Sequence, residues 1–135
     1  MKPLLVNSSM TNMDGDFYPE GHVFALFPDE DSARQCAQAL QDGQHHGELA
    51  YASPVTIHKD ILRTLNPADT VLPLIGKEGD TLRHIDRLAR SGHHGMLIEV
   101  TDKDTLDTVQ ATLREHEASA AFYYRAFAID VLIAP

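Results

Sequence analysis

The sequence predicts a single small α/β domain with a ferredoxin-like βαββαβ order, extended by an additional helix and a C-terminal strand. Apolar segments of strand length alternate along the chain with amphipathic segments of helix length. The segment Val71–Thr101 has the pattern of a strand, a glycine turn, a helix and a strand, and Phe24–Ala52 is a weaker copy of it. The chain has 135 residues, 43% of them hydrophobic, which is the size and composition of one domain with one core.

The chain divides into two parts. Residues 1–21 mix Asn, Ser, Met, Asp and Gly without periodicity, so we expect a flexible N-terminal arm. Residues 22–135 carry the regular patterns and are expected to form the single folded domain.

The first strand is expected at His22–Phe27, which is apolar almost throughout, as in a strand covered on at least one face. A helix should follow from Asp31 or Ser32, because either side chain can accept from the free amides of a first helical turn. Small apolar residues recur at helical spacing up to Gly43, which should end the helix.

The remaining elements are expected in a similar order. They are a strand at about Glu48–Ile57 broken at Pro54, a short helix or turn at His58–Leu65, a strand at Val71–Ile75, a helix from Asp80 to Ser91, a strand at Met96–Val100, a helix at Asp104–Glu117, and one or two strands in Ala120–Ala134. The loops 43–47 and 92–95 both contain His-His-Gly. If the two halves are copies, these loops emerge at the same end of the sheet.

Composition limits the class of partner. Twenty acidic residues against eleven basic ones give a formal charge of −9, which repels the phosphates of nucleic acids. No apolar run approaches the ~18–20 residues that a membrane-spanning helix needs. The single cysteine, Cys36, lies on the apolar face of its helix and is expected to be buried. We therefore expect an acidic cytoplasmic protein without membrane or nucleic-acid partners.

Two segments resemble small bacterial general-stress-type α/β domains. They are Gly95–Asp102, with the sequence GMLIEVTD, and Ala121–Arg125, with the sequence AFYYR. The resemblance implies a non-catalytic accessory domain, and it offers no catalytic residues to carry over. The expected function is a small binding or regulatory domain of stress-protein type, with a small ligand or a protein as its partner.

A shorter segment resembles the signature of the KH domain, Ile-Gly-x-x-Gly-x-x-apolar-x-x-Ile. It runs from Ile75 to Ile85 as IGKEGDTLRHI. The resemblance implies a single-stranded RNA-binding module in which a Gly-x-x-Gly loop approaches phosphates. The candidate contacts for RNA or another anion are Gly76, Lys77, Gly79, Arg83, Arg87 and Arg90. A strand at Val71–Leu74 favours the repeated βαβ plan, and a helix there favours the KH alternative.

The paired histidines support a third hypothesis, a transition-metal site. Neutral imidazoles bind zinc, copper or nickel, and two pairs at one end of a sheet would supply four ligands: His45, His46, His93 and His94. Solvated polar turns explain the same residues, so zinc or nickel remains an alternative to no cofactor at all.

Aromatic residues are concentrated near the C-terminus. Alternation along a strand places Phe122 and Tyr124 on one face, and Tyr123 and Phe127 on the other. One face is expected to join the core. Because the other face also needs burial, we expect a homo-oligomer or a protein partner there.

Overall fold

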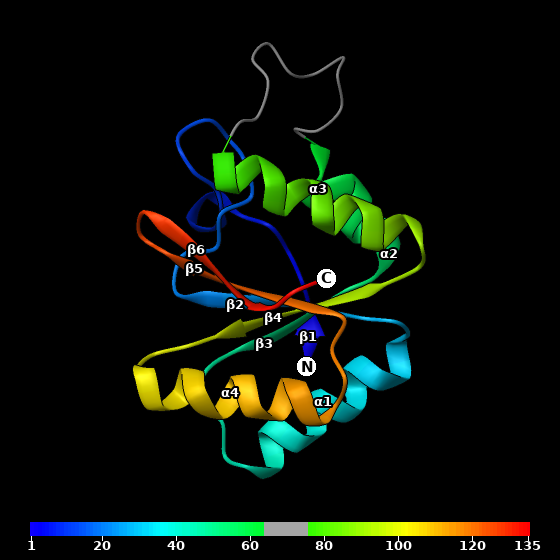
Figure 1. The fold of residues 1–135 in the computed structure, drawn as a ribbon, viewed down its shortest axis with the longest axis vertical. Coiled ribbons are helices and arrows are strands. Elements are labelled where there is room, and N and C mark those ends of the chain that lie inside the picture. The colour runs from blue at the N-terminus through cyan, green and yellow to red at the C-terminus, as the bar shows by residue number, and fades with distance from the viewer. Residues whose placement is uncertain (64–75) are drawn as a thin grey trace.

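The computed structural model describes residues 1–63 and 76–135, which form a six-stranded mixed sheet between two layers of helices (Figure 1). The strand order is β1-β3-β4-β2-β5-β6. The predicted α/β class is therefore confirmed. None of the helices in these two ranges has both the length and the apolar character needed to cross a membrane.

The elements have the following bounds. The strands are β1 (Lys2–Pro3), β2 (His22–Phe27), β3 (Leu49–Ala52), β4 (His94–Glu99), β5 (Ala120–Arg125) and β6 (Ala128–Ile133). The helices are α1 (Glu30–Asp42), α2 (Pro54–Thr56), α3 (Gly76–Arg90) and α4 (Lys103–Glu115), with the short helical turns η1 (Ser8–Met10) and η2 (Ile57–Ile61).

Two interlocked βαβ units form the centre of the sheet. Strands β2 and β3 are joined through α1 and are separated by β4, whereas β4 and β5 are joined through α4 and are separated by β2. This is the split arrangement expected of a βαββαβ plan. Strand β1 pairs parallel to β3, strand β6 pairs antiparallel to β5, and α3 lies on the opposite face from α1 and α4, so these elements extend the plan (Figure 1).

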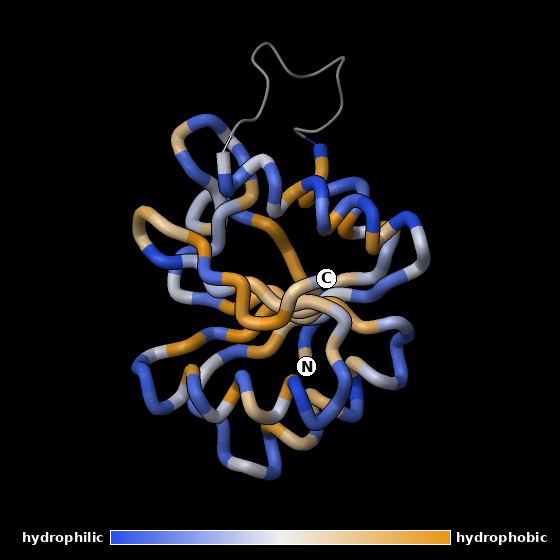
Figure 2. Tube along the Cα trace, in the orientation of Figure 1, coloured by the Kyte–Doolittle hydropathy of each residue, from blue (hydrophilic) through white to orange (hydrophobic). Residues whose placement is uncertain are grey.

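Both faces of the sheet are buried, which explains why β2 is apolar at successive positions (Figure 2). Val23, Ala25 and Phe27 point to the layer of α1 and α4, and Phe24 and Leu26 point to the layer of α3. The helices contribute apolar residues to these two clusters at helical spacing: Ala33, Cys36, Ala37, Leu40, Val109 and Leu113 on one face, and Leu82, Ile85 and Ala89 on the other.

The helices of the two βαβ units begin in the same way. The carboxylate of Asp29 accepts a hydrogen bond of 2.7 Å from the amide of Ser32, and that of Asp102 accepts one of 2.7 Å from Thr105. Asp29 rather than Asp31 or Ser32 is thus the N-cap of α1, and the expected end at Gly43 is confirmed. The structure therefore contains two βαβ units, but the second is β4-α4-β5 and not the segment Val71–Thr101 that the sequence suggested.

The N-terminal segment differs from the flexible arm that we expected. Strand β1 pairs with β3, and the side chains of Leu4 and Phe17 are buried against the face covered by α3. The ring of Phe17 meets the ring of Phe24 edge-on, with centroids 5.5 Å apart. Residues in this segment are therefore part of the core on this side, where they pack beside α3 and the short helical turn η2.

Two further local expectations are wrong. The second strand ends at Ala52, because Pro54 begins helix α2 instead of interrupting a strand. The expected turn at Gly76–Gly79 is the first turn of α3, and Gly79 is buried. The expected strand at Val71–Ile75 lies outside the described residues, and so does the end of the segment expected at His58–Leu65.

Candidate functional site

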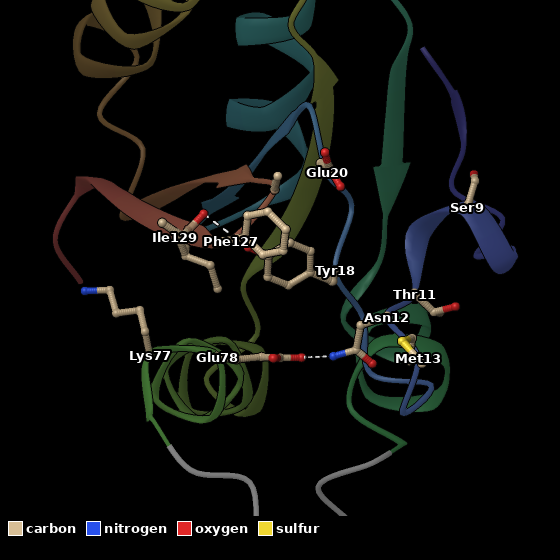
Figure 3. A pocket seen from close by; sticks show the side chains of 12 residues that line it. Ser9, Thr11, Asn12, Met13, Tyr18, Glu20, Lys77, Glu78, Phe127 and Ile129 are labelled. Carbon is tan, nitrogen blue, oxygen red and sulfur yellow. Dashed lines mark hydrogen bonds between the residues drawn. The ribbon is translucent and has the colours of Figure 1, made fainter.

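A cavity of about 520 Å³ lies where the β5–β6 hairpin, the N-terminal segment and the start of α3 meet (Figure 3). This volume falls in the range of about 300–1,000 Å³ that is typical of small-molecule sites. The residues that line it are Ser9, Thr11, Asn12, Met13, Tyr18, Glu20, Lys77, Glu78, Ala126, Phe127, Ala128 and Ile129.

The hairpin supplies the aromatic part of the site. Strands β5 and β6 are joined by only two residues, Ala126 and Phe127, and the Phe127 side chain at this tip is fully exposed. The hydroxyl of Tyr18 donates to the carbonyl oxygen of Arg125 at 2.6 Å, which fastens the N-terminal segment to the hairpin. The Tyr18 ring also meets the buried Tyr124 ring edge-on at 5.1 Å. A rigid aromatic wall therefore stands beside an exposed aromatic side chain.

Helix α3 supplies the acidic part of the site. The half-buried Glu78 accepts a hydrogen bond from the amide of Asn12. The carbonyl oxygen of the same Asn12 side chain accepts from the backbone amides of Asp14 and Asp16, each at 3.0 Å. The pKa of Glu78 is raised, first by burial and then by the negative charges of Asp16 and Asp14. The site thus combines apolar surface with a carboxylate held in a fixed place.

Noncovalent binding is the chemistry that this lining supports. Met13 and Phe127 present fully exposed apolar side chains, and isolated exposure of this kind becomes informative when it surrounds a cavity. Among the described residues, the hydroxyls of Ser9, Thr11 and Tyr18 in the lining donate to oxygens of Asn7, Ser8 and Arg125.

The structure does not bring the two histidine pairs together. His45 and His46 precede β3, near the end of the sheet that contains Glu99, whereas His94 begins β4 opposite Phe27, at the other end. The expectation of one shared end is therefore wrong. The expectation treated α3 as the counterpart of α1 in a second βαβ unit. In the structure α3 lies on the other face of the sheet, and its C-terminal loop leads into β4 from the opposite direction (Figure 1).

Three of these histidines form hydrogen bonds with other groups of the protein. The Nε2 atom of His45 donates to the carbonyl oxygen of Glu99 at 2.8 Å. His93 bridges the carbonyl oxygen of Leu88 and the hydroxyl of Ser119, each at 3.0 Å. Nδ1 of His94 lies 2.6 Å from the hydroxyl oxygen of Tyr51. Among residues 1–63 and 76–135, no group of three His, Cys, Asp or Glu side chains is placed to hold a metal ion.

The candidate RNA contacts lie on helix α3, where no Gly-x-x-Gly loop exists. Arg83 and Arg90 pair with carboxylates of the same helix, Asp80 at 3.2 Å and Asp86 at 2.9 Å. Arg87 lies 2.7 Å from Nδ1 of His84. The basic stripe is thus an exposed helix surface neutralised in part by its own acids. Of the six candidates, Lys77 alone lines the cavity.

Sequence reasoning missed most of the cavity. Asn12 and Tyr18 lie in the segment that we expected to be flexible, and Glu78 was not among the candidate site residues. Phe127 was identified as an apolar residue in need of burial, which was the one usable signal.

Comparison of the chain with known protein families, with curated proteins and with solved structures finds no match. The resemblances to general-stress domains and to KH domains remain predictions from the residues alone.

Proposed function

We propose that this protein is a non-catalytic binding domain that holds a small, partly apolar organic ligand in the cavity between Tyr18, Glu78 and Phe127. The observation that carries the proposal is the combination of a cavity of about 520 Å³ with fully exposed Met13 and Phe127 side chains in its lining. Covering an exposed Phe side chain contributes roughly 1.5–3 kcal/mol, which a ligand seated against the hairpin would gain.

A thermal-shift screen of aromatic fragments against the full chain tests this proposal. A fragment at ten times its Kd should stabilise the native state by about 1.4 kcal/mol and raise the Tm. The shift should be lost in Phe127→Ala. It should persist in Val55→Ala, which also truncates an exposed apolar side chain but lies outside the cavity. The proposal fails if no fragment stabilises the wild type, or if Phe127→Ala retains every shift.

The cellular setting is part of the same proposal. A cytoplasmic, stress-related role is supported by the resemblance of Gly95–Asp102 to stress-type domains and by the single cysteine, Cys36, which is buried and free. Recovery of the native protein from the cytoplasmic fraction, with higher abundance after stress, is the expected result. Export of the protein would contradict it.

Self-association is proposed through the outer edge of β6. This strand is the last of the sheet, and Val131 on it is 40% exposed. An edge strand presents backbone groups with which a second strand can pair, and on β6 the carbonyl oxygen of Leu132 already accepts from Gln110 and Arg114. A dimer mass in solution is expected for the wild type, and Val131→Lys should shift the mass toward the monomer. A monomeric wild type at high concentration would refute this part.

A further inference from the structure

Two carboxylates lie on different sides of the aromatic wall in the cavity. Glu78 reaches in from α3, and Glu20 reaches in from the segment before β2, with the Tyr18 ring between them (Figure 3). Both act on the same phenol: the pKa of Tyr18 is raised by burial first, then by the negative charge of Glu78, then by that of Glu20. The charges that act on this phenol are therefore two carboxylates against one guanidinium, that of Arg125.

No cation of the described residues forms an ion pair with either carboxylate. The nearby Arg125 is engaged with Asp130 at 2.9 Å, and Lys77 lines the cavity without pairing to its neighbour Glu78 within the described chain. Behind Glu78, the carboxylates of Asp14 and Asp16 add negative charge. An anionic ligand would be repelled by these carboxylates and attracted by Lys77 alone among the lining residues of the described chain. The charge of the lining therefore disfavours anions.

A metal ion does not fit the same features. Within ranges 1–63 and 76–135 there is no cluster of three acidic, histidine or cysteine ligands, whereas divalent cations take several oxygen donors. The lining is half aromatic and apolar, with Tyr18, Phe127 and Ile129 beside the carboxylates. A ligand with a cationic group and an apolar body would match both the carboxylates and the apolar residues of the lining.

We propose that the ligand of this cavity is a small organic amine, whose ammonium group lies against Glu78, with Glu20 adding negative charge from the other side of the Tyr18 ring, and whose aromatic or branched body packs on Tyr18 and Phe127. This inference rests on the proposed binding function and specifies the class of ligand. An ammonium group donates up to three hydrogen bonds and is attracted to the faces of aromatic rings within about 6 Å. Bonds to a charged acceptor are about twice as strong as neutral ones.

Isothermal titration of the full chain with three ligands of similar shape tests the charge directly. The ligands are 2-phenylethylamine, 2-phenylethanol and phenylacetate, which are cationic, neutral and anionic at pH 7. The amine should bind about tenfold more tightly than the alcohol, and phenylacetate more weakly than both. The preference for the amine should decrease as salt is raised.

Variants locate the effect. Glu78→Gln keeps an oxygen that accepts from Asn12, so the fold should be retained. This variant should lower the affinity for the amine about tenfold and change the affinity for the alcohol less than twofold. Glu20→Gln should lower the affinity for the amine by a smaller factor. The control is Glu115→Gln, an exposed carboxylate on α4 beyond the opposite face of the sheet, and it should leave all three ligands unchanged.

The outcomes separate the inference from the function that it specifies. If the alcohol or phenylacetate binds as tightly as the amine, the amine assignment is overturned and the binding cavity stands. If none of the three binds and the fragment screen is also negative, both fail. If Glu115→Gln weakens the amine as much as Glu78→Gln, the net charge of the protein explains the preference and the assignment to Glu78 is overturned.

Discussion

The hydroxyl oxygen of Tyr51 lies 2.6 Å from Nδ1 of His94, and the same hydroxyl donates to Glu30 at 3.0 Å. A phenol has one proton, so the bond to Glu30 requires that Nδ1 of His94 carries the proton of the other bond. Arg34 lies over the Tyr51 ring at 5.3 Å and pairs with Glu30. These linked side chains connect the start of β4 to the start of α1, at the end of the sheet away from His45.

Replacement of Tyr51 by Phe should lower the free energy of unfolding by about 0.5–1.5 kcal/mol, because two hydrogen bonds are lost while the ring that contacts Arg34 is kept. Urea unfolding measures this change. Tyr123→Phe is the matched control, since no hydrogen bond of the Tyr123 hydroxyl is found in the described chain. Equal losses in the two variants would contradict a role for the Tyr51 bonds.

Alkaline pH should destabilise the protein through its tyrosines. Burial is the main cause that raises the pKa of Tyr51 to about 12, and it also raises the pKa of Tyr18 and Tyr124. Groups that bind protons more tightly in the native state make stability fall as pH rises between the unfolded and the native pKa, here from 10 toward 12. At pH 11 the native protein should show less tyrosinate absorbance than the urea-unfolded chain. Identical absorbance would show that the phenols are not protected.

The ends of α1 and α4 each hold a non-glycine residue in the left-handed region, Gln44 with φ +59° and Glu117 with φ +55°. Each follows a helix and is succeeded by a residue whose amide bonds back to the last turn, as in a Schellman ending. Gln44→Gly and Glu117→Gly should therefore each stabilise the fold by about 0.5–1 kcal/mol. Gln41→Gly, the same kind of change inside α1, should destabilise it by about 1 kcal/mol. Losses at all three positions in urea would contradict this interpretation.

Gly95 in β4 allows the ring of Phe24 to lie against the strand. An added Cβ would be 2.5 Å from Cζ of Phe24, closer than any real contact. Gly95→Ala should cost about 1–3 kcal/mol, because a core ring has to move. Gly43→Ala is the control, since Gly43 has φ −80° and its nearest contact would be 3.4 Å away. Urea midpoints that do not separate the two variants would show that the core adapts at no cost.

Cys36 reports on global unfolding. Its side chain is fully buried on the sheet-facing side of α1, and burial raises the pKa of the thiol to about 12. An aromatic disulfide reagent at pH 8 should therefore modify Cys36 only at the rate at which the whole domain opens, because the thiolate is the reactive form. Rapid modification of the native chain would show that α1 opens locally.

The fold was predictable where one residue pattern decided it. The continuous apolar run at His22–Phe27, the cap region at Asp29–Ser32 and the stripe ending at Leu40 predict β2 and α1 almost as observed. The long-range pairing was less predictable. Similar glycine and histidine loops suggested α3 as the partner of α1, whereas α4, with its Asp102 cap, occupies that place.

The site was hardly predictable, because it depends on contacts far apart in the sequence. Asn12 meets Glu78 across 66 positions, and Tyr18 meets Arg125 across 107. The first 21 residues lack periodicity, since Leu4 and Phe17 are single anchors that fill gaps beside α3. A pattern search finds elements that repeat, and such anchors do not repeat.

The most direct test of a binding site between the hairpin and α3 is a ¹H–¹⁵N NMR titration of the full chain with 2-phenylethylamine. The account predicts saturable shifts of the backbone amides of Tyr18, Glu78 and Phe127, with the amides of His46 and Thr108, which line the smaller groove between α1 and α4, unchanged. Saturable shifts confined to that groove, or no shifts at millimolar ligand, would contradict it.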